Sequence, residues 1–151
     1  MHIQVDQARI TQEIEALAAI SEVEPPAVTR IVFSEQDLRA RKWLNERLSE
    51  AGLAVRVDAV GNTFAQWEGS RPDLPAVATG SHIDAIPYAG KFDGVVGVLG
   101  GLEAIRSLKA SGFRPIRSIE LIHFTSEEPT RFGVGCLGSR LLSGTLSSEA
   151  D

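Results

Sequence analysis

The sequence has few of the features that mark secreted, membrane-bound or nucleic-acid-binding proteins. Its single cysteine, Cys136, excludes an internal disulfide, which agrees with a reducing compartment. Lys and Arg number 15 against 20 Asp and Glu, and this net charge of −5 favours neither nucleic acid nor a membrane surface as a partner. The first residues form no signal peptide pattern, and the chain has no long apolar run, so we expect a cytoplasmic protein.

The composition that is present fits one soluble domain. The 151 residues are 43% hydrophobic and 23% charged, which suffices for one core. Hydrophobic periodicity predicts helices and strands in a definite order: helices over 7–20, 35–51 and 94–112, and strands over 53–58, 63–69, 75–82 and 117–124. We therefore predict an α/β fold, a three-layer domain with a largely parallel or mixed central sheet covered by helices.

Histidine and carboxylate side chains follow two of these predicted strands at their carboxyl ends. His82 and Asp84 follow one strand, Asp93 precedes the next helix, and Glu127 and Glu128 follow another strand. A strand, helix, strand order favours parallel pairing, so these ends should meet at one edge of the sheet. Burial of such groups is costly without a partner, and a metal ion satisfies imidazole and carboxylate together. The pattern predicts a metal site.

The positions of these residues also suggest separate roles. Asp84 lies two residues after His82, where it can orient the imidazole by accepting its second N–H. Asp93, at the expected N-cap of the next helix, has two oxygens and could bridge two ions. One of the adjacent Glu127 and Glu128 could bind metal while the other acts as a base on water. Metal-assisted hydrolysis is the implied reaction class.

The same segments resemble a known family. GSHIDAIPYAGKFDGVVGVLGGLEA and FTSEEPTRFGVGCLGSRLLSG, together with VTRIVFSEQDLRARKWL and VDAVGN, closely resemble the M20-type metallo-amidohydrolases. This amidase branch of the dinuclear metallopeptidases includes N-carbamoyl-L-amino-acid hydrolases, allantoate amidohydrolases and ureidoglycolate amidohydrolases. AIPYAGKFDG and EEPTRFG favour the members that hydrolyse ureides.

The resemblance implies a role for each candidate residue. His82 becomes a ligand of one metal, Glu128 a ligand of the other, and Asp93 the bridge between them. Glu127 becomes the general base, and Asp84 supports His82. The implied cofactors are two divalent ions, zinc or manganese first and cobalt or nickel next. The implied partner is a small ureide or N-carbamoyl substrate whose C–N bond is hydrolysed.

The resemblance covers only part of the family's chain. Residues 1–151 match the N-terminal part of the catalytic domain, without the lid domain or the C-terminal part. In the family those missing parts supply two further histidine ligands. We therefore expect this chain alone to be inactive and to form a homo-oligomer. The alternatives are a catalytically silent metal-binding or interaction module and a related aminopeptidase-like or aminoacylase-like hydrolase.

Other polar and aromatic residues receive structural interpretations. His123 lies among apolar residues in a predicted strand, so we expect it in the core. Cys136 lies in the glycine-rich GVGCLGSR and is expected to be a small buried residue. Trp43 and Trp67 are expected to anchor the core. Arg131 could contact substrate or pair with a nearby acid, and the sequence leaves both open.

Overall fold

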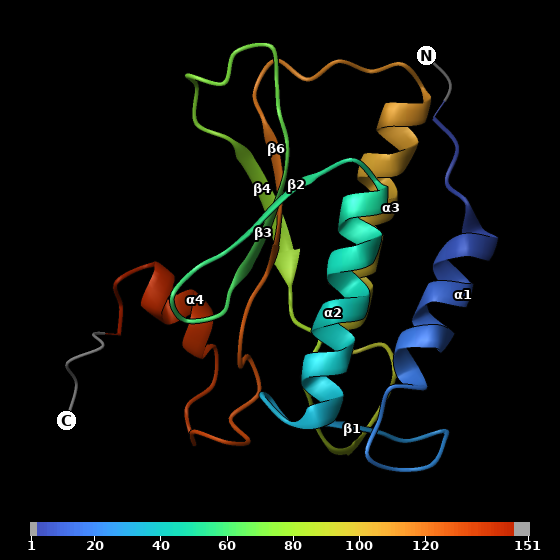
Figure 1. Cartoon of the computed structure of the whole chain (residues 1–151), viewed down its shortest axis with the longest axis vertical. Helices are drawn as coiled ribbons and strands as arrows, with labels where there is room; N and C mark the ends of the chain where they lie inside the picture. The colour runs from blue at the N-terminus through green and yellow to red at the C-terminus, as the bar shows by residue number, and fades with distance from the viewer. Residues whose placement is uncertain (1–2, 147–151) are drawn as a thin grey trace.

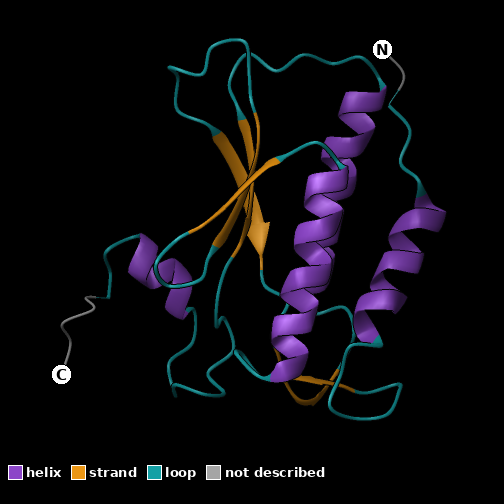
Figure 2. Cartoon of the chain, viewed as in Figure 1, coloured by secondary structure: helices purple, strands orange, loops and turns teal. Residues whose placement is uncertain are grey.

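The computed structural model describes residues 3–146 of the chain. Helices and strands follow one another in the order expected of an α/β domain (Figure 1, Figure 2). The elements are α1 (Gln7–Ala18), β1 (Val28–Arg30), α2 (Glu35–Glu50), β2 (Ala54–Val57), β3 (Thr63–Trp67), β4 (Val77–Ser81), β5 (Ala85–Ala89), α3 (Val95–Ala110), β6 (Ile119–His123) and α4 (Leu137–Leu142).

The centre of the domain is a mixed sheet with the strand order β2-β3-β6-β4. Strands β2, β3 and β6 pair antiparallel, because β2 and β3 form a hairpin and β3 pairs with β6. Strand β4 runs parallel to β6, with Ser81 opposite His123. The parallel pair that the strand, helix, strand order predicted is therefore confirmed. The carboxyl ends of β4 and β6 lie at the same edge of the sheet.

Helices α2 and α3 pack on one face of this sheet, and α1 packs outside them against α3 (Figure 1). Leucines from α1, α2, α3 and β6 form the core between these layers; Leu17, Leu44, Leu48, Leu99, Leu102 and Leu121 are each at most 1% exposed. Figure 1 shows α4 on the other side of the sheet. The predicted α/β fold with helices and a mixed sheet is confirmed, and α2 and α3 cover one face of that sheet.

The boundaries of α2 follow the sequence signals. Ser34 is the N-cap, and its hydroxyl accepts a hydrogen bond from the amide of Asp37. The helix ends before Gly52, which adopts φ +69°, a conformation that glycine tolerates without strain. The predicted second helix is thus confirmed at both ends.

The glycines of α3 let the helix lie close to the sheet. A Cβ on Gly97 would lie 2.6 Å from the Ser81 Cβ, and one on Gly101 would lie 2.8 Å from Leu121 Cδ1. Both distances are shorter than van der Waals contact, so larger side chains would push α3 away from β4 and β6. This close packing fixes the amino end of α3 beside the end of β4.

Three parts of the structure were not predicted. Strands β1 and β5 form a separate antiparallel pair with an irregular register. Helix α4 is only six residues long and follows glycine-rich sequence. Strand β4 lies within the predicted range, but its place at an edge of the sheet, with four of its five residues exposed, was not predicted.

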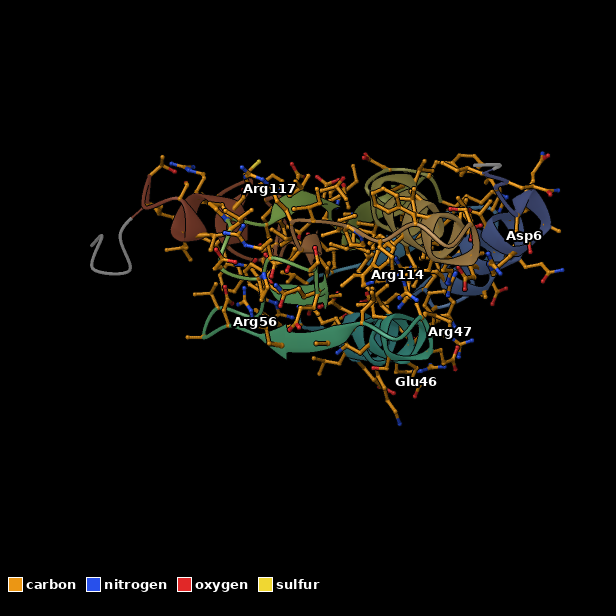
Figure 3. The ribbon with its side chains drawn as sticks, turned by 90° about the horizontal axis from the view of Figure 1, so that it is seen from above. Asp6, Glu46, Arg47, Arg56, Arg114 and Arg117 are labelled. Carbon is orange, nitrogen blue, oxygen red and sulfur yellow. The ribbon has the colours of Figure 1, made fainter. Side chains whose placement is uncertain are left out.

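The two ends of the sheet differ in chemistry. Arg114 and Arg117 lie in the loop between α3 and β6, at the end of the domain that faces the viewer in Figure 3. The acidic residues that follow β4 and β6 lie at the other end. In the described part of the chain, no helix is long and apolar enough to cross a bilayer.

Candidate metal centre

Three of the predicted site residues converge where β4 and β6 end. His82 directly follows β4, and Glu127 and Glu128 follow β6 after a short loop. One possible ligand atom from each of these three residues lies within 4.8 Å of the others. The parallel pairing of β4 and β6 explains this convergence, because it places both strand ends at one edge.

The imidazole of His82 is held in a defined orientation. The side chain is nearly buried, and Nδ1 lies 3.0 Å from the backbone oxygen of Asp84. A carbonyl oxygen only accepts, so Nδ1 carries the proton in neutral His82 and the lone pair is on Nε2. Nε2 lies 3.5 Å from Glu127 Oε2 and 3.8 Å from Asp93 Oδ1. The free lone pair therefore points toward the carboxylates.

Asp84 supports the site in a way that the sequence did not predict. Its carboxylate, 1% exposed, accepts the backbone amides of Glu127 at 3.3 Å and of Glu128 at 3.0 Å. Nδ1 of His82 is hydrogen-bonded to the Asp84 carbonyl, and Asp84 Oδ1 lies further away at 3.5 Å. Asp84 thus orients the imidazole mainly through its backbone, and its carboxylate ties the two strand ends together.

The structure corrects the predicted N-cap of α3. Gly94, with φ +64°, is the N-cap, so Asp93 lies one residue before it. The Asp93 side chain is 71% exposed and lies outside the cluster of His82, Glu127 and Glu128. A Cβ on Gly94 would lie 2.5 Å from His82 Nε2, so a side chain there would collide with the imidazole. The bridging role of Asp93 stays a prediction.

The negative charges of the cluster shift its protonation equilibria. Burial raises the pKa of Glu128, and the charge of Glu127 raises it further. Burial alone would lower the pKa of His82, but the hydrogen bond and charge of Asp84, with that of Glu127, outweigh burial and raise it. Carboxylates this close together repel one another, and a cation between them would relieve the repulsion.

Cys136 does not have the buried position that its sequence context predicted. The thiol is exposed, and Sγ lies 3.2 Å from Glu127 Oε1. Cys136 adopts φ 56° at the N-cap of α4, and its amide donates to the Glu127 carbonyl at 2.7 Å. The hydrogen bond to Glu127 raises the pKa of the thiol. The prediction failed because α4 was not foreseen.

The remaining expectations have mixed outcomes. His123 is 2% exposed, as expected of a core residue, and within residues 3–146 neither ring nitrogen has a hydrogen-bond partner. Trp43 and Trp67 pack against the core and are only partly buried. Arg131 donates from Nε to the Val32 carbonyl at 2.7 Å, so its observed partner is backbone.

The donor set fits a divalent metal ion. An imidazole nitrogen with a free lone pair faces two carboxylates, and the glycine at position 94 leaves their meeting point open. Imidazole and carboxylate ligands suit zinc, manganese, cobalt and nickel with little discrimination among them. The cluster is therefore consistent with divalent metal use and does not identify the ion.

An α/β domain with histidine and carboxylates at the carboxyl edge of its sheet is consistent with a hydrolase that uses a divalent metal. The sequence model of Peptidase family M28 matches residues 62–150, more than half of the chain. The chain belongs to this family. The matching model is that of family M28, whereas the sequence motifs resemble the M20-type amidohydrolases. The predicted amidohydrolase relatives are confirmed.

The similar proteins are considerably longer than this chain. Ureidoglycolate hydrolase of Arabidopsis thaliana is 57% identical over 143 residues, which cover 95% of the chain and 30% of that protein. N-carbamoyl-L-amino acid amidohydrolase of Geobacillus stearothermophilus is 38% identical over 94% of the chain and 35% of that protein. The crystal structure of AtUAH in complex with glyoxylate matches with a TM-score of 0.93 at 57% identity, over 95% of the chain and 34% of that structure. The chain spans about a third of these relatives.

Proposed function

We propose that this chain forms part of the catalytic domain of a metal-dependent amidohydrolase that cleaves carbamoyl or ureido C–N bonds. The observation that carries the proposal is the convergence of His82, Glu127 and Glu128 at one sheet edge. The names of the relatives support the reaction class, since they include a ureidoglycolate hydrolase and an N-carbamoyl-L-amino acid amidohydrolase.

Each residue of the site has a proposed task. His82 would hold one divalent ion through Nε2, Glu128 would hold a second, and Asp93 would contact both. When bound, the ions would polarise the substrate carbonyl and favour ionisation of water at neutral pH. Glu127 would accept the proton of the attacking water, because its Oε2 faces the site, 3.5 Å from His82 Nε2. Asp84 would hold the residues after β4 and β6 in fixed positions relative to each other.

The bridging role proposed for Asp93 predicts a large effect of this residue on metal affinity. A residue that contacts both ions should matter more for affinity than a ligand of one ion. Asp93→Ala should therefore abolish metal binding in a calorimetric titration. Asp73→Ala is a matched control, because Asp73 is an exposed acid that pairs with Arg71 in another loop. An unchanged affinity in Asp93→Ala would refute the bridge.

The proposed substrates are small ureides or N-carbamoyl compounds that carry a carboxylate. Ureidoglycolate is the first to test, because identity to the Arabidopsis thaliana ureidoglycolate hydrolase is 57%, against 38% for the Geobacillus stearothermophilus carbamoyl enzyme. Allantoate and N-carbamoyl-L-amino acids complete the set. The assay measures hydrolysis of each compound with added manganese or zinc. Hydrolysis of unrelated peptides in preference to all three would contradict the proposed class.

The role of Glu127 as general base is tested in a catalytically active protein. Glu127→Gln in a full-length relative with the same motif keeps the size of the side chain and removes the basic oxygen. The expected result is a loss of kcat of about 100-fold or more with metal content unchanged. Near-normal kcat at normal metal content would refute the role of Glu127.

A second candidate is a metal-binding module without catalytic activity. It is favoured by one observation: the described residues bring together three possible ligand side chains, His82, Glu127 and Glu128, which can hold an ion without taking part in a reaction. The module would bind metal and hydrolyse none of the three substrate types. Turnover by the purified 151-residue chain would exclude it.

A further inference from the structure

Two sequence motifs have no role in the proposed reaction, and each contributes a side chain that is hydrogen-bonded to Thr125. Arg41, from the motif around residues 28–44, donates from Nη1 to Thr125 Oγ1 at 3.1 Å. Asn62, the last residue of VDAVGN, accepts the Thr125 amide on Oδ1 at 2.9 Å. Thr125 stands two residues before Glu127. Both motifs therefore form hydrogen bonds to the loop that carries Glu127 and Glu128.

Asn62 joins three separate parts of the chain through one side chain. It is 0% exposed. Its Nδ2 donates to Asp58 Oδ2 at 2.9 Å and to the Gly138 carbonyl at 3.1 Å, while Oδ1 accepts from Thr125. The turn between β2 and β3, the loop after β6 and α4 therefore meet at this amide. A side chain that both donates and accepts in one plane is needed for these contacts.

The start of helix α4 is hydrogen-bonded to the loop that carries the acidic residues. The amides of Cys136, Leu137 and Gly138 donate to three consecutive carbonyls of the loop, those of Glu127, Ser126 and Thr125, at 2.7, 2.9 and 2.9 Å. Asn62 in turn binds the Gly138 carbonyl. A Cβ on Gly138 would overlap Asn62 Oδ1, so the amide and α4 are in tight contact.

The loop itself adopts a backbone conformation that needs such restraint. Ser126 has φ 52°, a conformation that is strained for a residue other than glycine and persists only where the surroundings enforce it. On one side Asp84 binds the amides of Glu127 and Glu128. On the other side Asn62 and α4 hold the preceding residues. Release of either side should let the carboxylates move.

We propose that Asn62 is a positioning residue that sets the direction of Glu127 and Glu128 by fixing Thr125 and α4 together. The expected effect of Asn62 on metal affinity rests on the function proposed above, but its effect on the position of the loop does not. A role limited to packing would change global stability alone. A positioning role changes the loop and the metal environment more than it changes the rest of the fold.

The first test measures amide hydrogen exchange in the metal-free chain, in the wild type and in Asn62→Ala. Exchange should accelerate at least tenfold at the loop and α4 amides relative to the amides of β3 and β6; the loop and α4 amides are those of Thr125, Glu127, Glu128, Cys136, Leu137 and Gly138. Glu103→Gln is the matched control, because buried Glu103 binds Arg9 and the Asp6 amide far from the site. The control should leave the loop amides unchanged.

The second test measures metal. Asn62→Ala should lower zinc or manganese affinity by roughly 10- to 100-fold and shift the visible absorption spectrum of bound Co²⁺. Glu103→Gln should do neither. Failure of the wild type to bind metal would overturn the proposed function, while the exchange data would still decide the role of Asn62. Uniform or absent acceleration of exchange would overturn that role whatever the metal result.

A milder variant covers the case in which Asn62→Ala does not fold. Asp58→Ala keeps the Asn62 side chain and removes the acceptor of its Nδ2, together with the acceptor of the Val60 and Asn62 amides in the turn between β2 and β3. Exchange at the same loop and α4 amides should again accelerate relative to β3 and β6, by a smaller factor. A folded Asp58→Ala protein with unchanged loop and α4 exchange would then overturn the proposal.

Discussion

The carboxylate of Asp84 accepts the backbone amide of Glu128 at 3.0 Å, which links the residue after His82 and Ile83 to the loop that follows β6. The two residues are far apart in the sequence. The parallel pairing of β4 and β6 brings the histidine and the acidic pair to one edge of the sheet, and this contact fixes the loop beside His82. It also shows why a buried aspartate is tolerated there: two amide donors, from Glu127 and Glu128, satisfy its charge.

Asp84→Asn should weaken metal binding by roughly 10- to 100-fold with little change in volume. The amide has a single acceptor oxygen, so its NH₂ group would face one of the two backbone donors that Asp84 now binds. Calorimetric titration with zinc measures the effect. Asp73→Asn, in an exposed loop, is the control. A folded Asp84→Asn protein with wild-type affinity would show that the contact is dispensable.

The convergence of His82, Glu127 and Glu128 could be predicted from sequence because parallel strands joined by a helix end at the same edge. The covering helices were predictable for a similar reason, since Leu44 and Leu48 repeat on one helical face. The position of Cys136 could not be foreseen. Its helix has six residues and begins after glycines, so neither periodicity nor composition indicates it.

Other parts could not be predicted because they depend on contacts between distant residues. The pairing of β1 with β5 joins short segments more than fifty residues apart through an irregular register. Asp93 looked like an N-cap, yet Gly94 takes that position, because only a residue without Cβ fits beside His82. Local sequence signals do not report such steric demands.

Gly94→Ala should abolish or severely weaken metal binding. The added Cβ would lie 2.5 Å from His82 Nε2, and φ +64° is unfavourable for alanine, so the imidazole or the start of α3 must move. Gly100→Ala is the matched control within α3, because its Cβ would meet no atom within 4 Å. Metal titration and thermal unfolding of both variants decide the question. Equal behaviour of the two variants would contradict the steric account.

His123 should make the protein less stable in mild acid. Burial holds the pKa of His123 well below its usual value of 6.5, and the positive charges of Arg41, His82 and Arg30 act in the same direction. Below about pH 6.5 the unfolded chain therefore binds a proton that the folded chain cannot, so stability is lost as the pH falls, by up to about 1.4 kcal/mol per pH unit.

Urea unfolding of the metal-free wild type and His123→Leu at pH 7.5, 6.5 and 5.5 tests this assignment. The variant should lose less stability than the wild type between pH 6.5 and 5.5. His82, whose pKa is raised, contributes with the opposite sign but is present in both proteins. The same pH dependence in both would show that His123 is not the titrating group.

The chain should self-associate through β4. This strand is at the edge of the described sheet and largely exposed, and unpaired edges of this kind pair with other chains. Light scattering over a range of concentrations should detect dimers or larger species. Ala78→Lys, in β4, should reduce them, whereas Ala104→Lys on the exposed side of α3 should not. A wild type that stays monomeric at all concentrations would contradict this expectation.

The most direct measurement is a calorimetric titration of the metal-free chain with Zn²⁺, repeated for Glu127→Gln and Glu128→Gln. The two variants make the same chemical change at adjacent positions, one assigned as the base and the other as a metal ligand. The account predicts saturable binding in the wild type, nearly unchanged binding in Glu127→Gln, and a loss of roughly tenfold or more in Glu128→Gln. Absence of binding in the wild type, or equal affinity in all three proteins, would contradict the proposed metal centre.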